Sequence, residues 1–174
     1  YPSGKIVGEV TRKAAEETGF AKGTPVVCGG GDQQCGAIGV GVVRRGRIKA
    51  TTGTGTFILS FLDKPSFDPK RRVLCSCHGI PGKWVQEASI FSTGAIYRWF
   101  RDEFGHLEKG VAELAGIDPY EMLNREAAAS PAGSQGVLVI PHFVGAGAPH
   151  WNHYARGVIM GLAIGHTRKD LVRA

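Results

Sequence analysis

The alternation of apolar and polar positions divides the chain into short strands and helices. A hairpin is predicted over residues 47–62, with its turn at the glycines of residues 53–55. Pro81 and Gly82 are expected to form a second turn between two more strands. The remaining strands are predicted from short apolar or alternating runs at 25–28, 73–77, 83–87 and 136–141. The first and last of these runs are almost wholly apolar, which is typical of strands covered on both faces.

Apolar residues at helical spacing predict six helices. Gly19 is a C-cap signal for the first helix, Ser92 an N-cap signal for the third, and Asp118 with Pro119 marks the start of the fifth. The expected helical ranges are 6–18, 33–40, 94–104, 107–115, 118–129 and the residues from 167 onward. Strands in sequence, then helices, then a further strand and helix indicate a mixed α/β layer structure.

Length and composition fit a globular protein and exclude some classes. A chain of 174 residues is long enough for one domain or for parts of two. Its 26 glycines are about twice the usual share and follow no fixed period, which indicates tight turns and close backbone approaches. No apolar run reaches the ~18 residues that span a bilayer, so we expect no membrane partner. The chain has no initiator Met and ends inside an expected helix, and we interpret it as a piece of a longer protein.

The net charge of +6 raises the possibility of a nucleic-acid partner. No aromatic interleaving, zinc-finger spacing or RNA-binding signature accompanies the basic residues. A solvated face is therefore the favoured interpretation, with a phosphate-handling surface as the alternative, and no nucleic-acid partner is expected.

The cysteines are too few for a secreted disulfide scaffold of this length. They stand at Cys28, Cys35, Cys75 and Cys77. Cys75 and Cys77 with His78 could bind a soft metal, but a second pair of ligands at zinc-like spacing is missing, and the alternation fits a strand. We therefore expect no metal site here. We also expect the thiols to be free, which indicates the cytoplasm.

Two glycine-rich turns carry the candidate chemistry. Residues 29–34 read Gly-Gly-Gly-Asp-Gln-Gln directly after an apolar run, and residues 53–56 read Gly-Thr-Gly-Thr between two strand-like runs. Glycines let backbone N–H groups approach a ligand closely, and threonine hydroxyls add donors. A lone acid, Asp32, beside an anion cradle indicates proton abstraction from a hydroxyl next to a bound phosphate chain. The structural alternatives are a helix start for Asp32 and a plain hairpin turn for residues 53–55.

These two turns and two later segments resemble the FGGY carbohydrate kinases, the family of glycerol kinase and xylulokinase. The later segments are 87–103 and 141–166, and a pattern similar to the family's C-terminal signature follows up to Ala174. The ordered series of motifs is more specific than any one of them.

The resemblance implies an α/β, ribonuclease-H-like (actin-like ATPase) fold that is incomplete in this chain. Residues 1–48 would be the C-terminal tail of the family's N-terminal domain, and residues 49–174 the first part of its C-terminal domain. The family's N-terminal phosphate-and-magnesium segment and its later nucleotide-base segment are absent. We therefore expect the isolated chain to be inactive and to self-associate as a homodimer through surface that those segments would cover.

The resemblance also implies an ATP-dependent, cytoplasmic kinase that phosphorylates a hydroxyl of a small polyol or ketose, of the glycerol or xylulose type, with Mg²⁺. The implied roles are catalytic base for Asp32, substrate contacts for Gln33 and Phe57, and nucleotide-phosphate contacts for Gly53, Thr54, Gly55 and Gly94. Structural alternatives are a first-turn helix residue for Gln33, a core aromatic for Phe57 and close packing for Gly94.

The chain departs from the family pattern in one loop. Residues 145–147 read Gly-Ala-Gly where the family usually carries charge, and Asn152-His153 stands where Asp-Pro usually follows the Trp. A non-catalytic sugar- or nucleotide-binding module derived from the same family is the alternative function. His150 and His153 could form a metal pair, although the flanking Trp151 and Tyr154 fit a packed loop better.

Overall fold

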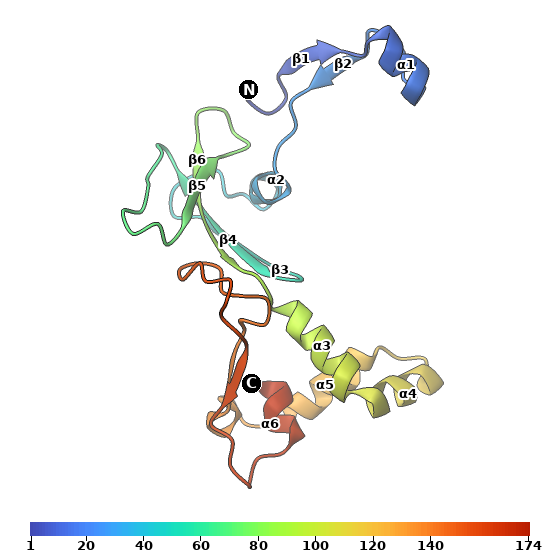
Figure 1. Ribbon diagram of the computed structural model, residues 1–174, viewed down its shortest axis with the longest axis vertical. Helices are drawn as coiled ribbons and strands as arrows, with labels where there is room; N and C mark the ends of the chain where they lie inside the picture. The colour runs from blue at the N-terminus through green and yellow to red at the C-terminus, as the bar shows by residue number, and fades with distance from the viewer. The chain divides into compact units, whose positions relative to one another are not determined.

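The computed structural model describes residues 1–174 as a mixture of helices and strands (Figure 1). Two compact units divide the chain: unit 1 is Tyr1–Ala50 with Phe57–Ala88, and unit 2 is Thr51–Thr56 with Ser89–Ala174. The strands are β1 (Ile6–Glu9), β2 (Pro25–Val27), β3 (Ile48–Thr52), β4 (Thr56–Leu62), β5 (Leu74–Cys77), β6 (Trp84–Ile90), β7 (Leu138–Ile140) and β8 (Val158–Met160). The α-helices are α1 (Arg12–Thr18), α2 (Asp32–Gly39), α3 (Gly94–Phe104), α4 (His106–Ala115), α5 (Pro119–Ala128) and α6 (Arg168–Arg173), with one 3₁₀ turn, η1 (Ser134–Gly136).

A four-stranded sheet with the order β3-β4-β6-β5 carries the predicted hairpin. β3 and β4 are joined across residues 53–55, and β5 pairs with β6 in antiparallel register from Leu74 opposite Glu87 to Cys77 opposite Trp84. Both predicted turns are confirmed. They could be predicted because glycine at each turn marks the point where the strand alternation breaks.

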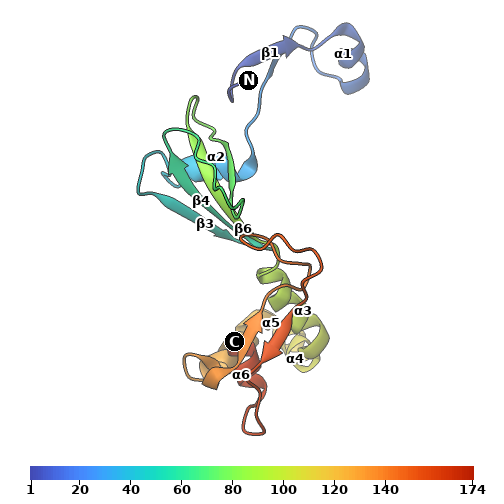
Figure 2. The ribbon, with the colours of Figure 1, turned by 60° about the vertical axis from the view of Figure 1, so that its left-hand side comes forward.

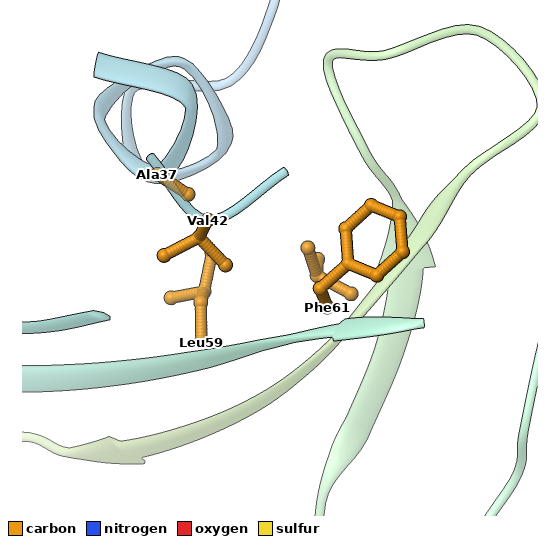
Figure 3. Packing of buried hydrophobic residues seen from close by; sticks show 5 residues of the cluster. Ala37, Val42, Leu59 and Phe61 are labelled. Carbon is orange, nitrogen blue, oxygen red and sulfur yellow. The ribbon is translucent and has the colours of Figure 1, made fainter. Parts of the chain in front are cut away.

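Helix α2 covers one face of this sheet and forms the core of unit 1 (Figures 2 and 3). The core residues are Ala37, Val42, Leu59, Phe61 and Val85, each at most 6% exposed. Alanine on the inner side of α2 lets the helix lie close to the sheet. Burying a Leu or Val side chain fully is worth roughly 1.5–3 kcal/mol.

The predicted helix over 6–18 is wrong in its first half. Residues Ile6–Glu9 form β1, which pairs antiparallel with β2, and α1 begins only after Thr11, whose side chain accepts a hydrogen bond from the Ala14 N–H. β-Branched Ile6 and Val7 favour the strand. Gly19 ends α1 with a φ of +79°, as predicted.

The expected burial of residues 25–28 is also wrong for this chain. Strand β2 lies where it was predicted, but all three of its residues are exposed. It pairs only with β1, and a two-stranded sheet has no further layer to cover it.

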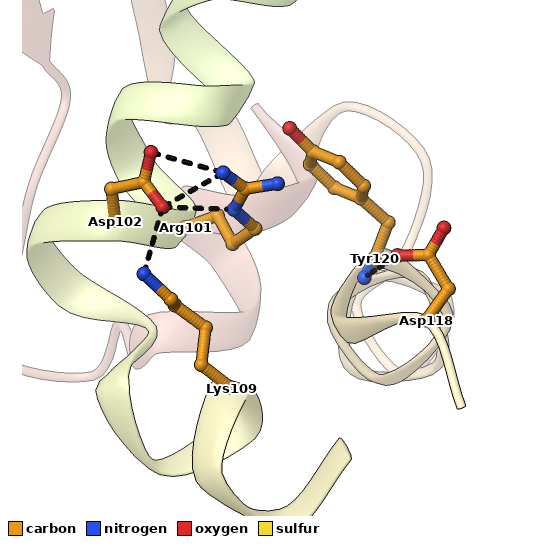
Figure 4. A network of polar contacts seen from close by, with 5 residues as sticks. All are labelled: Arg101, Asp102, Lys109, Asp118 and Tyr120. Carbon is orange, nitrogen blue, oxygen red and sulfur yellow. Dashed lines mark hydrogen bonds and ion pairs between the residues drawn. The ribbon is translucent and has the colours of Figure 1, made fainter. Parts of the chain in front are cut away.

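In unit 2, a polar network joins α3, α4 and α5 (Figure 4). Asp102 accepts hydrogen bonds from Arg101 at 2.8 Å and from Lys109 at 3.1 Å, and the Arg101 guanidinium lies 4.8 Å from the centre of the Tyr120 ring. Asp118 caps α5 by accepting from the Tyr120 N–H at 2.9 Å, which confirms its predicted role. The Lys109 bond thus joins α4 to α3, and the contact of Arg101 with the Tyr120 ring joins α5 to α3.

The predicted cap at Ser92 is wrong. Thr93 is the residue before α3, and its side chain makes no capping bond. Ser92 is buried, and its hydroxyl donates to the Pro141 carbonyl oxygen at 2.8 Å. The Ser92 side chain thus bonds to a residue distant in the sequence instead of capping α3.

The C-terminal part of unit 2 is a hairpin of β7 and β8 followed by α6. The two strands pair antiparallel, with Leu138 opposite Met160. The expected burial of 136–141 holds at Val137, which is 1% exposed, and fails at Leu138, which is 59% exposed. Thr167 and Asp170 form a capping box at the start of α6. No helix of the chain combines the length and apolar character needed to cross a membrane.

Candidate functional site

Asp32 is the first residue of α2, directly after residues 29–31, which form no turn in the structure although the sequence predicted one. Its carboxylate accepts a hydrogen bond from the Gln33 N–H at 2.7 Å, and the residue is exposed. A carboxylate in the first helical turn is favoured by the helix dipole. The structure thus places an accessible carboxylate at a fixed point, and this placement fits both a helix-start role and a proton-accepting role.

Gln33 is held by a lysine that the sequence analysis did not single out. The ammonium group of Lys49 donates to the Gln33 side-chain oxygen at 2.6 Å and to its backbone carbonyl oxygen at 3.1 Å. Lys49 is the second residue of β3, so these bonds connect the start of α2 with the edge of the sheet.

Glu87 on β6 interacts electrostatically with Lys49 and with Asp32. Partial burial raises the pKa of Glu87, the charge of Lys49 opposes this shift, and the charge of Asp32 adds to it. One cationic and two anionic side chains therefore influence one another around Gln33. Alternation along the hairpin placed Lys49 on one face with Thr51, and this was the sequence signal available for finding it.

Phe57 packs against the core of unit 1. It is partly buried beside the cluster that contains Leu59 and Phe61. This is the core position weighed as the alternative in the sequence analysis. A contact between Phe57 and a substrate stays a prediction.

The glycine turn of residues 53–55 is joined to the start of α3 in unit 2. The Gly53 N–H donates to the Gly55 carbonyl at 2.8 Å, and the Thr54 carbonyl accepts from the N–H groups of Thr93 and Ala95 at 2.9 and 3.1 Å. Carbonyl groups of the turn thus satisfy N–H groups at the start of the helix, which would otherwise lack partners.

Gly55 and Gly94 stand where a side chain would not fit. A Cβ atom at Gly55 would lie 2.5 Å from the Ile90 carbonyl oxygen, and one at Gly94 would overlap with the Gly53 carbonyl oxygen. The Gly94 N–H donates to that same oxygen. The structure thus shows close packing at Gly94, and a contact with nucleotide phosphates stays a prediction.

Threonine hydroxyls line the base of this turn. Thr56 shares hydrogen bonds with Thr52 at 3.1 Å and with Thr93 at 3.0 Å, while Thr54 is exposed at the tip. A cavity of about 460 Å³ begins beside them, with Thr52, Thr93 and Gly94 at its rim. Its other walls are mainly apolar, including Ile96, Tyr97, Trp99, Phe100, Val139 and Phe143. Concave sites with apolar walls and few polar groups are typical of small-molecule binding.

One histidine from each of the two metal sites considered in the sequence analysis makes other contacts in the structure. His78 is buried, and its ring nitrogens contact the Val42 carbonyl at 2.9 Å and the Ile80 N–H at 3.2 Å, so both are engaged. His153 stacks on Phe91 with ring centres 6.4 Å apart. Residues 1–174 contain no group of three or more His, Cys, Asp or Glu side chains that could hold a metal ion.

The predicted site residues fall into two groups. Asp32, Gln33 and Phe57 belong to unit 1, and Gly53, Thr54, Gly55 and Gly94 belong to unit 2. In the first group, Asp32 and Gln33 are adjacent at the start of α2 and Phe57 packs beside the core of the unit. In the second group, hydrogen bonds join the turn to Gly94 at the start of α3.

Residues 48–174 match the FGGY family of carbohydrate kinases, C-terminal domain. Among curated proteins, an autoinducer-2 kinase of Yersinia pestis (strain Pestoides F) is 44% identical over 138 residues, covering 79% of this chain and 26% of that protein. The chain thus spans about a quarter of the length of the curated relatives it matches.

Solved structures cover nearly the whole chain. A xylulose kinase from Rhodospirillum rubrum aligns with a TM-score of 0.73 and 30% identity over 99% of this chain and 33% of its own. A Plasmodium falciparum glycerol kinase with ADP aligns with a TM-score of 0.68 and 24% identity over 99% of this chain and 32% of its own. These neighbours confirm the predicted ribonuclease-H-like, actin-like ATPase fold.

Proposed function

This chain belongs to the FGGY family of carbohydrate kinases, and from that premise we propose that the protein containing it transfers the γ-phosphoryl group of ATP to a hydroxyl of a small polyol or ketose. Names of similar proteins supply the candidate acceptors: xylulose, glycerol, gluconate and autoinducer-2. In domain terms, we propose that residues 1–48 end the N-terminal domain and that residues 49–174 begin the C-terminal domain.

The observation that carries the proposal is the exposed carboxylate of Asp32 at the start of α2, next to the Gln33 amide. Phosphoryl transfer depends mainly on positioning and charge stabilisation. A carboxylate within hydrogen-bond reach of the acceptor hydroxyl takes its proton as the oxygen attacks phosphorus. Gln33 offers an amide that can hydrogen-bond an acceptor hydroxyl.

For ATP, we propose the turn that contains Gly53, Thr54 and Gly55, with Gly94 allowing its close approach to α3. Gly53 and Thr54 are exposed in this turn, whereas Gly55 is buried, and the Thr54 hydroxyl is a donor for a phosphate oxygen. ATP supplies the transferred phosphoryl group. Magnesium is implied by the family, and no residue of this chain is assigned to it.

We also propose a cytoplasmic location and self-association of the isolated chain. All four cysteines are free thiols, which are typical of a reducing compartment. Ile6 on β1 and Val27 on β2 are 60% and 54% exposed, and strand edges of this kind tend to pair with another chain. A monomer in sedimentation velocity, or a periplasmic location in cell fractionation, would count against the respective proposal.

The test is an ADP-release assay of the complete protein with ATP-Mg²⁺ and each of the four candidate acceptors. We expect turnover with at least one of them and none from the isolated 174-residue chain. Thermal stabilisation by ATP or an acceptor without turnover would instead support a non-catalytic binding module. Turnover by the isolated chain would overturn the assignment of a partial site to it.

A further inference from the structure

Lys49 lies on the covered face of the edge strand β3, where an apolar residue would be expected. Along this strand Lys49 and Thr51 are half-buried, whereas Ile48 is 66% exposed. Removing an ammonium group from water is costly unless it finds partners. The cost of burying Lys49 therefore depends on the groups that its ammonium binds.

Its partners are two oxygens of one residue. The Lys49 ammonium lies 2.6 Å from the side-chain oxygen of Gln33 and 3.1 Å from its backbone carbonyl oxygen. Helix α2 leaves room for this contact at Gly36, where a Cβ atom would lie 3.3 Å from the same ammonium nitrogen. Glu87 on β6 provides a compensating negative charge.

The chemistry of the pair fixes the orientation of the Gln33 amide. An ammonium group has three donors and no acceptor, so the amide must turn its oxygen toward Lys49. Its NH₂ group then faces away from the lysine. Gln33 is thereby set to donate hydrogen bonds to a ligand and prevented from offering its oxygen.

We propose that Lys49 is a positioning residue for the phosphate acceptor, which holds the Gln33 amide so that its NH₂ group binds a hydroxyl or carbonyl oxygen of the polyol or ketose. This inference rests on the proposed function. Lys49 lies outside the glycine-rich segments, and the NH₂ end of the Gln33 amide is the end that contacts the substrate.

A purely structural role predicts different behaviour. β3 is an edge strand, and inward-pointing charges on edge strands discourage pairing with other chains. If this were the whole role of Lys49, its loss would change stability or association and leave substrate binding unchanged.

The experiment compares Lys49→Met, Lys49→Arg and Gln33→Ala in the complete protein, with Lys64→Met at an exposed position as the matched control. Lys49→Met keeps a side chain of similar length but removes the hydrogen-bond donors. We expect the acceptor KM to rise about tenfold, in the range for the loss of a hydrogen bond to a charged group. The KM for ATP should stay within about twofold in the same assay. Lys49→Arg retains donors and should restore most of the acceptor affinity.

The decisive readout is the double variant Lys49→Met with Gln33→Ala. Because Lys49 acts through Gln33, the double variant should have the acceptor KM of Gln33→Ala alone. Additive effects, or an unchanged acceptor KM in a folded Lys49→Met variant, would overturn the proposal.

Failure of the proposed function gives a separate result. Where the wild type binds an acceptor without turnover, the kinase assignment fails and the same comparison is made with Kd from calorimetry. Where it neither binds nor phosphorylates any of the four acceptors, both proposals are overturned.

Discussion

The Gly94 N–H donates a 3.0 Å hydrogen bond to the Gly53 carbonyl oxygen, and this bond ties the glycine turn to the first turn of α3. The contact requires glycine, since a Cβ atom at position 94 would overlap with the accepting oxygen. The geometry of the proposed phosphate-binding turn therefore depends on a residue 41 positions further along the chain.

We expect Gly94→Ala to impair the use of ATP more than the use of the acceptor. The added methyl group pushes the turn away from α3, and a displacement of about 1 Å can cost about 10²-fold in rate. The measurement is kcat/KM for each substrate in the complete protein. Gly110→Ala is the matched control, because a Cβ atom there meets nothing within 4 Å. Equal losses for both substrates would show that the turn does not act on the nucleotide.

We expect Asp32→Asn to lower kcat by ~10²–10⁴-fold and to leave the acceptor KM nearly unchanged. Asparagine keeps the size and one hydrogen-bonding oxygen, but it cannot take the proton of the attacking hydroxyl. Steady-state kinetics of the complete protein measure both constants. Glu17→Gln removes an exposed carboxylate on α1 and should change neither. If a folded Asp32→Asn variant keeps more than about a third of kcat, far above this range, Asp32 is only a helix-start residue.

Local signals in the sequence predicted much of the fold. The hairpin around Gly53 and Gly55 and the start of α5 at Asp118 lie where they were expected, because each is decided by a few adjacent residues. The same local signals did not predict the strand β1, since its formation depends on pairing with β2, about 20 residues away.

The candidate site was predictable only in part, for the same reason. Glycine-rich turns identified Asp32 and Gly53, but the contact of Lys49 with Gln33 joins residues 16 apart and leaves no motif. Ser92 shows the reverse error. The sequence predicted a helix cap at this residue, but its hydroxyl donates to the carbonyl oxygen of Pro141, which lies 49 residues away.

Glu87→Gln should stabilise the protein near neutral pH. Burial raises the pKa of Glu87 above its unfolded value of about 4.3, so ionisation at higher pH costs folding free energy. Glutamine removes that cost above the folded pKa and makes no difference below about pH 4, where both states hold the proton. Urea denaturation at several pH values measures the difference. A lower midpoint for the variant at neutral pH would mean that the ionised Glu87 is held favourably by Lys49.

Asp170→Asn should destabilise the protein near neutral pH and have less effect in acid. Asp170 is fully buried, and its carboxylate accepts from the Thr167 N–H at 2.8 Å and from the Ser130 hydroxyl at 2.7 Å. These bonds, that of the Thr167 backbone first, hold the pKa of Asp170 well below its usual range. A carboxyl with a lowered pKa contributes stability above its unfolded value of about 3.9, and this contribution is lost as the pH falls further.

The gap in urea midpoint between wild type and Asp170→Asn should therefore be widest near neutral pH and narrow below about pH 4. Asp118→Asn is the matched control, because asparagine caps a helix about as well as aspartate does, and its effect should be small at every pH. A gap of equal size across this range would mean that Asp170 acts through its shape and hydrogen-bonding oxygen rather than through its charge. No gap at neutral pH would mean that the capping box at Thr167 does not need the carboxylate.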